Sequence, residues 1–299
     1  MTAPALYLSE PSWFARQWWL LWRAFLSAWE DNCFSIAKGA AYSSLLSFFP
    51  VMTSLTTILV QANATEISTE ITLFLFDVAP PGTQELIERF FSIKGDQPGW
   101  LIVVALLLSL WAASGAMISL MEGFNAAYRV PTGRGPIAER GVAVLLVFCV
   151  ALPGVGASAL ILFGNQAEAA LMTSVGLLRD GADLQGWILF FGKALRLALA
   201  LGAIVLGTAL LYQIGPNRRV RFRNVWPGAI VATGLWFAAT AGFSWYVRNI
   251  ANYNVLYGSI AAAIALLVWM YLLSVIAFTG CEFNVALERL RTIERRTAK

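Results

Sequence analysis

The chain has 299 residues, of which 59% are hydrophobic and only 13% are charged. Because soluble domains carry roughly 25% charged residues, this composition excludes a soluble globular protein and predicts an integral membrane protein. Histidine is absent, which removes the most common general base and metal ligand. The three cysteines, Cys33, Cys149 and Cys281, lie far apart in sequence, so we expect neither a disulfide framework nor a zinc site.

Residues 1–11 read as a tail, and residues 12–30 predict an amphipathic helix. Arg16 and Arg23 fall along one edge of this helix. Its other faces carry tryptophans, whose rings favour the membrane interface: Trp13, Trp18, Trp19, Trp22 and Trp29. We therefore expect the helix to lie in the headgroup layer. A seventh spanning helix is the alternative, and the two arginines and the short length argue against it.

The first spanning helix is expected at about residues 36–61, which are long and apolar enough to cross a bilayer. Lys38 lies at its start and Pro50 interrupts it. Small residues recur at every fourth position on one face, where a neighbouring backbone can approach closely: Gly39, Ser43 and Ser47. This pattern predicts a central helix, which either only packs or lines a substrate path.

Five further apolar segments predict the remaining spans, at about residues 100–123, 142–164, 187–214, 225–247 and 260–283. We expect Pro153 to bend or locally unwind the third span. Pro227 is placed in the first helical turn of the fifth span, where a proline is tolerated.

The predicted fold is therefore an all-α integral membrane protein, a six-transmembrane-helix bundle with an N-terminal interfacial amphipathic helix. Its expected parts are the tail and interfacial helix (1–34), the six-helix membrane domain (35–285) and a basic cytoplasmic tail (286–299).

Basic residues alternate between the loops. They gather before span one, between spans two and three, between spans four and five, and after span six, at Arg16, Arg23, Arg129, Arg134, Arg140, Arg218, Arg219, Arg221, Arg223, Arg289, Arg291, Arg295, Arg296 and Lys299. By the positive-inside rule, this alternation predicts that both termini are cytoplasmic. The same rule accounts for the net charge of +4, so the basic character does not indicate a nucleic-acid partner.

Polar residues are expected at particular depths in the bundle. Those near the cytoplasmic boundary are Asp31, Lys38, Glu122, Asn125, Tyr128, Glu282 and Asn284, and those near the outer boundary are Tyr246, Tyr253, Tyr257 and the adjacent Gly258. In one interpretation they reach headgroups and cap neighbouring helices. In the other, Lys38 pairs with Glu122 or Glu282 at the inner end of a cavity, because a charge near hydrocarbon is costly unless paired or hydrated. Tyr42, Ser47, Pro50 and Pro153 complete this candidate cavity and gating set, in which the two prolines are the bending points.

Several motifs together resemble the YihY/BrkB family of bacterial inner-membrane proteins. They are AAYSSLLSFFP (40–50), FNAAYRV (124–130), LYQIGPNRRVRFRNVWPGA (211–229), YGSIAAAIALLVWMYL (257–272) and GCEFN (280–284). The resemblance implies a six-helix bundle in the inner membrane. Members have carried ribonuclease BN and virulence-factor labels, and a transport or lipid-export role has also been proposed.

The residues disfavour the ribonuclease label and any enzyme. A histidine-rich zinc site has no ligands here, and a magnesium site needs converging carboxylates, whereas the acids are scattered in sequence. No P-loop is present, and we expect no cofactor.

Two hypotheses stay open. One is a transporter or exporter of an amphipathic or lipid-like solute, and the other is a non-transporting scaffold or envelope-maintenance factor that binds lipid or a partner protein. A continuous polar cavity reaching mid-membrane would favour the first, and a closed bundle with an exposed groove the second. Membrane lipids are the expected partners, and a homo-oligomer is compatible with both hypotheses.

The orientation is testable by labelling. In cells with a permeabilised outer membrane, a cysteine introduced as Leu75→Cys should react with an impermeant maleimide, because the loop at residues 62–99 is expected outside. Val220→Cys should stay unlabelled until the inner membrane is opened. The reverse pattern would overturn the predicted orientation.

Overall fold

The structure is a computed structural model. It describes residues 13–61, 68–69, 71–72, 83–91, 99–131, 133–174, 186–249 and 260–297, which form helices and turns and no strand. The main helices are α1 (Trp13–Glu30), α2 (Cys33–Gln61), α4 (Gln84–Phe91), α5 (Gly99–Ala127), α6 (Pro136–Ser174), α7 (Gly186–Ile214), α8 (Phe222–Asn249) and α10 (Ile260–Thr297).

Six of these helices, α2, α5, α6, α7, α8 and α10, are long and apolar enough to cross a membrane. Each predicted span lies within one of them. Several helices extend beyond the predicted spans, and α10 continues to Thr297 through the residues of the expected C-terminal tail. Arg16 of α1 forms an ion pair with Glu294 of this extension, at 2.7 Å between Nη2 and Oε1.

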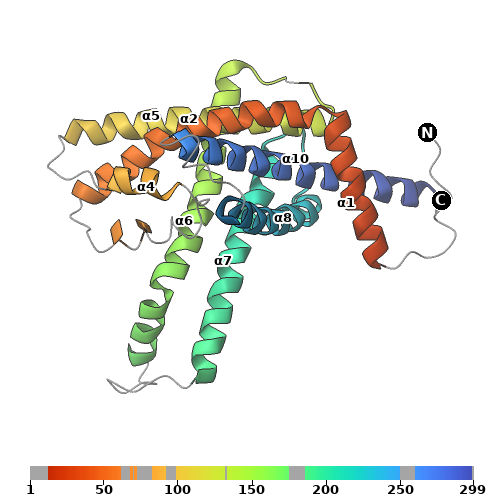
Figure 1. Cartoon of the computed structure of the whole chain (residues 1–299). Helices are drawn as coiled ribbons and strands as arrows, with labels where there is room; N and C mark the ends of the chain where they lie inside the picture. The colour runs from red at the N-terminus through yellow and green to blue at the C-terminus, as the bar shows by residue number, and fades with distance from the viewer. Residues whose placement is uncertain are drawn as a thin grey trace.

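The spans pack as three pairs, α2 with α5, α6 with α7, and α8 with α10 (Figure 1). The pairs converge at the end of the bundle formed by residues 31–40, 121–131, 133–134, 209–229 and 278–288, which we call the basic end. Away from it, α6 and α7 run together in a different direction from α2, α5 and α10 (Figure 1). Large apolar side chains are exposed along these outer parts, as at Leu107, Leu152 and Leu195. Their surface suits lipid rather than water.

The buried core lies at the basic end. Phe124 of α5 is completely buried there and packs edge-on against Tyr212 of α7, with ring centroids 5.4 Å apart, and against Phe278 of α10, at 5.8 Å. The Tyr212 hydroxyl donates a hydrogen bond to the carbonyl oxygen of Ala277, at 2.7 Å. One cluster of rings thus joins a helix from each of the three pairs.

Close backbone contact fixes the crossing of α8 over α10. A Cβ atom on Gly228 would overlap the carbonyl oxygen of Gly280 and lie 2.5 Å from Nδ2 of Asn284. The Asn284 side chain accepts a hydrogen bond from the backbone N–H of Gly228 (2.7 Å) and donates one to the carbonyl oxygen of Val225 (3.1 Å).

Two proline predictions need correction. Pro227 lies inside α8, which begins at Phe222, and not in its first turn. A proline there removes an N–H from the helical ladder, and the Asn284 amide supplies hydrogen bonds to the backbone on either side of it. The unwinding predicted at Pro153 is wrong, because α6 stays helical from Pro136 to Ser174. Helices tolerate such prolines in bundles where neighbours re-satisfy the freed groups.

The crossing makes a prediction about two glycines of α8. Gly228→Ala should lower the midpoint of thermal unfolding in detergent by several degrees, because overpacking costs about 1–3 kcal/mol. Gly234→Ala is the matched control, since a Cβ atom at Gly234 meets nothing within 4 Å. It should leave the midpoint unchanged or raise it slightly, because alanine is the better helix former. Equal effects of the two substitutions would contradict the close α8–α10 contact.

Candidate functional site

An ion pair holds the turn between α1 and α2 against the end of α5. The Arg129 guanidinium donates from Nε to both carboxylate oxygens of Asp31, at 3.0 and 3.2 Å, and its Nη2 lies 3.0 Å from Oδ1. The Asp31 side chain is only 12% exposed. Because the hydrogen bond and the charge of Asp31 favour the protonated guanidinium, the pKa of Arg129 is raised above its ordinary value.

The backbone presents Arg129 in an unusual conformation. Its φ is 52°, in the left-handed region that favours glycine. The N–H of Val130 donates to the carbonyl of Asn125, and the N–H of Arg129 donates to that of Ala126. This is the Schellman end of a helix, with arginine at the position where glycine is usual. The left-handed turn places the Arg129 side chain beside Asp31. The ion pair with Asp31 offsets the small backbone strain of this turn.

Glu282 of α10 lies directly behind this pair. It is 1% exposed and is the one charged residue that is buried within the described part of the chain. Its carboxyl is within hydrogen-bonding reach of Asp31, with the charges of Arg129 and Arg289 nearby. Its Oε1 atom is buried without a hydrogen-bond partner. The arrangement therefore keeps one carboxylate oxygen available to hold a proton or accept a hydrogen bond.

Side-chain contacts with the backbone close the basic end. The Asn125 Oδ1 atom accepts a hydrogen bond from the N–H of Asn217 at 2.7 Å. Arg134 donates to the carbonyl oxygens of Ile214, Gly215 and Pro216 at 3.0–3.1 Å. These hydrogen bonds hold the chain between α7 and α8 against α5 and the segment that follows α5.

Tyr128 is buried beneath the guanidinium of Arg218, whose Cζ lies 5.0 Å from the ring centroid. Burial raises the pKa of the Tyr128 phenol, so the hydroxyl stays protonated at any physiological pH.

An apolar groove opens farther along the bundle, between α6, α7, α8 and α10. Its volume is about 280 Å³, and its lining includes Val150, Ala203, Thr233 and Leu273. Tyr212 lines the groove and also belongs to the core at the basic end, as do Leu211 and Ala232, so the groove adjoins the core. The hydroxyl of Thr233 donates a hydrogen bond to the carbonyl oxygen of Ala229. The groove is therefore an apolar site rather than the continuous polar cavity that a polar solute would need.

Two small residues shape this groove. Gly154 follows Pro153 on α6, and Gly207 faces it from α7, where an added Cβ atom would lie 3.6 Å from the carbonyl oxygen of Cys149. The indole N–H of Trp236, another lining residue, is buried without a hydrogen-bond partner. A ligand with an apolar chain would complement the apolar lining of this groove.

The family model for the virulence factor BrkB matches residues 24–299 of this chain. The protein belongs to the BrkB family. Among its relatives, the ribonuclease-like protein YfkH of Bacillus subtilis (strain 168) is 29% identical, with 85% of this chain and 89% of the relative covered. UPF0761 membrane proteins from Alkalilimnicola ehrlichii and Alteromonas mediterranea are 28% and 26% identical over 90% and 86% of this chain. The chain spans 58% of the Alkalilimnicola protein and 84% of the Alteromonas protein.

No solved structure matches the chain. The UPF0761 relatives are named as membrane proteins, and the described part of this family member contains six helices suited to crossing a membrane. It is therefore a multi-pass membrane protein. Within the described residues, no group of three cysteine or acidic residues is placed to hold a metal ion.

One predicted contact of this BrkB-family protein is wrong. Lys38 is exposed on α2, and the described part of the chain contains no ion pair between it and Glu122 or Glu282. The inward face of α2 carries Cys33, Ala37 and Ala40, and this face excludes Lys38 from the interior that holds Glu282. Arg129 is the cation beside the buried acids.

The other candidates separate into groups. Asp31, Asn125, Tyr128, Glu282 and Asn284 come together at the basic end. Tyr42 and Glu122 are exposed, Ser47 is half-buried and donates to the carbonyl of Ser44, and Tyr246 is exposed beside the ring of Phe243. Pro50 and Pro153 are half-buried within continuous helices. Tyr253, Tyr257 and Gly258 lie outside the described residues.

Sequence reasoning missed Arg129, Arg134 and Tyr212 as site residues. Arg129 belongs to the FNAAYRV motif, and Tyr212 belongs to the segment that begins LYQIGPN. Both segments are among the motifs that carry the family resemblance. A tyrosine within an otherwise apolar span is a usable signal, because its hydroxyl requires a partner.

We predict energetic coupling between Asp31 and Arg129. Arg129→Gln should destabilise the protein by about 1–3 kcal/mol, because it leaves a largely buried carboxylate without its donor. The double variant with Asp31→Asn should be less destabilised than the sum of the single variants. A double-mutant cycle on unfolding in detergent measures this coupling.

Lys38→Gln supplies the matched control for that cycle, because it removes a cation from an exposed position of the same end of the bundle. Combined with Asp31→Asn it should be additive. Coupling of Asp31 to Lys38 instead of Arg129 would refute the observed pairing.

Proposed function

We propose that this protein is a transporter or exporter of an amphipathic, lipid-like solute and not an enzyme. The observation that carries the proposal is the apolar groove, which is lined by four different spanning helices. A groove between spans is reached from the lipid phase, where such a solute resides.

The lining of the groove favours an acyl chain over a polar solute. Val150, Ile204 and Leu273 offer apolar contacts, and the open space beside Gly154 leaves room for a chain. A volume of about 280 Å³ is at the small end of ligand pockets, so it would accept part of a lipid while the rest stays in the bilayer.

Tyr212 is the element that we assign as the barrier. Its ring lines the groove and packs in the core at the basic end, and its hydroxyl donates a hydrogen bond to the carbonyl oxygen of Ala277 in α10. Passage toward the basic end requires that α7 move relative to α10 and that this hydrogen bond break. The buried, partly unpaired carboxyl of Glu282 is placed to respond to such movement, since a proton or water could then reach it.

We further propose an inner-membrane location with both termini cytoplasmic. The support is the concentration of arginines at the basic end. The α1 helix would lie in the headgroup layer on that side, because Trp18, Trp22 and Trp29 are 56–70% exposed. Membrane lipids are its proposed partners and nucleic acid is not, and a second copy of the chain is compatible with the exposed apolar faces.

The second candidate is a scaffold or envelope-maintenance factor that binds lipid without moving it. It is favoured by the closure of the basic end through Arg134 and Asn125. A closed end with an exposed groove is what lipid binding alone requires.

A pair of substitutions on α7 tests the groove. Ala203 lines it, whereas Ala198 is exposed elsewhere on the same helix. In proteoliposomes that carry a fluorescent phosphatidylethanolamine, the rate of lipid transfer between leaflets can be followed by dithionite quenching, with and without an imposed pH gradient. Ala203→Phe should slow the transfer about tenfold by filling the groove, and Ala198→Phe should leave it within twofold of the unmodified protein.

Wild-type protein that transfers lipid no faster than protein-free vesicles, with or without a gradient, would contradict the transporter proposal. Retained lipid binding in that case would support the scaffold. Equal slowing by both substitutions would show that the groove is not the path.

A further inference from the structure

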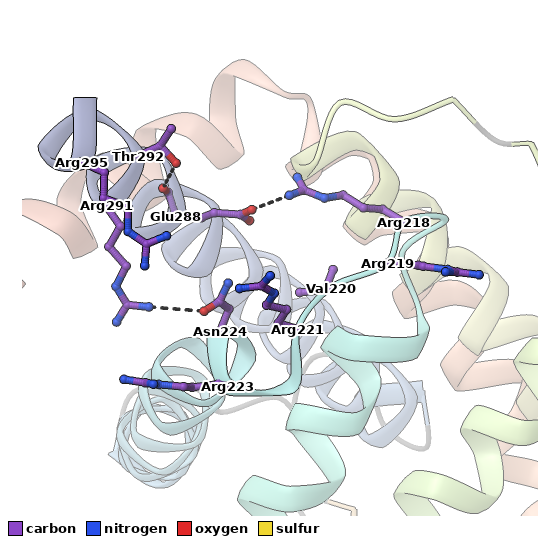
Figure 2. A pocket seen from close by; sticks show the side chains of 10 residues that line it. All are labelled: Arg218, Arg219, Val220, Arg221, Arg223, Asn224, Glu288, Arg291, Thr292 and Arg295. Carbon is purple, nitrogen blue, oxygen red and sulfur yellow. Dashed lines mark hydrogen bonds and ion pairs between the residues drawn. The ribbon is translucent and has the colours of Figure 1, made fainter. Parts of the chain in front are cut away.

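We propose that an arginine-lined pocket at the basic end binds a phosphate group, carried by an anionic lipid headgroup or by a soluble phosphate compound. The pocket has a volume of about 440 Å³, which is within the usual range for ligand sites. It is formed by the chain that leads into α8, the first turn of α8 and the C-terminal extension of α10 (Figure 2). The lining residues are Arg218, Arg219, Val220, Arg221, Arg223, Asn224, Glu288, Arg291, Thr292 and Arg295.

The charges of this pocket do not balance. Six arginines and one glutamate line it, and that glutamate, Glu288, is already paired with Arg218. Arg291 donates only a long hydrogen bond, 3.5 Å, to Oδ1 of Asn224. Within the described residues, the side chains of Arg221, Arg223 and Arg295 have no hydrogen-bond or ion-pair partner.

Membrane orientation alone does not explain why these arginines line one pocket. The positive-inside rule requires arginines on one side of the membrane, but it does not require them to face a common hollow. On α10, Glu288, Arg291, Thr292 and Arg295 fall at spacings that share one helical face. This face is turned toward the arginines before α8, about 70 residues earlier in sequence (Figure 2). Like charges brought together in this way repel, and a bound anion removes the repulsion.

Guanidinium groups match a phosphate in geometry as well as charge. Each presents a planar fork of donors that binds phosphate oxygens in pairs, which a lysine ammonium does not. Arg221 and Arg291 flank Asn224, whose amide adds a neutral donor (Figure 2). Arg219 points away from this group in the same view, so we assign the contacts to Arg221, Arg223, Arg291 and Arg295.

The surroundings favour a lipid as the source of the phosphate. Phe222 and Trp226 stand in the first turns of α8, with ring centroids 5.4 Å apart, and Phe222 is exposed. Aromatic rings at the start of a spanning helix favour the level of the headgroups. A headgroup phosphate would therefore lie at the height of the pocket. The inference does not depend on transport, because a phosphate can bind here whether or not the protein moves lipid.

The test is a binding measurement on purified full-length protein in detergent, read as the shift of its thermal unfolding midpoint. The probes are phosphatidylglycerol, phosphatidylcholine, inorganic phosphate, pyrophosphate and a short oligoadenylate RNA. The double variant Arg221→Gln/Arg291→Gln removes two guanidinium groups from the pocket. Arg23→Gln/Lys38→Gln removes the same charge from exposed positions outside it and serves as the control.

We expect phosphatidylglycerol to raise the midpoint more than phosphatidylcholine does. The pocket variant should weaken this binding about tenfold or more, and the control should stay within twofold of wild type. Stabilisation by pyrophosphate or phosphate with the same dependence on the variant would assign the site to a soluble compound. Both results support a phosphate site.

Equal weakening in the pocket variant and in the control would overturn the proposal, because it would show only a general effect of charge. Absence of stabilisation by every phosphate probe would do the same, as would a response to RNA alone. If the double variant does not purify as a folded protein, Arg295→Gln replaces it, since the Arg295 side chain makes no hydrogen bond or ion pair with the described residues.

Discussion

The rest of the structure depends on the packing of Phe124 against Tyr212 and Phe278 at the basic end. In a bilayer, helices gain little by hiding apolar surface from lipid, so their association depends on close packing and on hydrogen bonds between them. Both are concentrated here, in the ring cluster, in the contact of Gly228 with Gly280, and in the Asn284 amide that bonds to the backbone of α8. The six spans are therefore held together firmly at one end.

Away from the basic end, the helices expose large apolar side chains. Leu107 and Leu152 expose their side chains, and the α6–α7 pair leaves the core in a direction of its own (Figure 1). A bundle fixed at one end can change the spacing of its helices at the other without disturbing its core. The apolar groove is lined by α6, α7, α8 and α10, so movement of α7 against α10 would change its width.

The basic end combines two electrostatic situations a short distance apart. Inside, Arg129 forms an ion pair with Asp31, and Glu282 is buried beside that pair with one oxygen that has no hydrogen-bond partner. Outside, the arginines that precede α8 face those of α10 with little compensating negative charge. The interior thus has an excess of acid and the surface an excess of base. This separation is consistent with a protein whose inner end meets anionic headgroups while its core responds to protons or helix movement.

Much of the fold and part of the candidate site could be predicted from the sequence. The apolar segments predicted six helices, and Asp31, Asn125, Glu282 and Asn284 were expected at one depth because each lies at the end of an apolar span. The predicted pairing of Lys38 failed for a physical reason. Depth along a helix can be read from residue number, but the direction in which a side chain points depends on which helix packs against that face, and α2 buries Cys33 and Ala37 instead.

The sequence by itself determined the number of spanning helices, their approximate limits and the uneven distribution of arginine, because hydropathy and charge are properties of each segment alone. Only the tertiary structure decided that Arg129 meets Asp31, that Gly228 meets Gly280, and that arginines about 70 residues apart line one pocket. Those contacts depend on the pairing of helices and on a left-handed turn at Arg129, which a non-glycine residue adopts only when the surrounding structure holds it there.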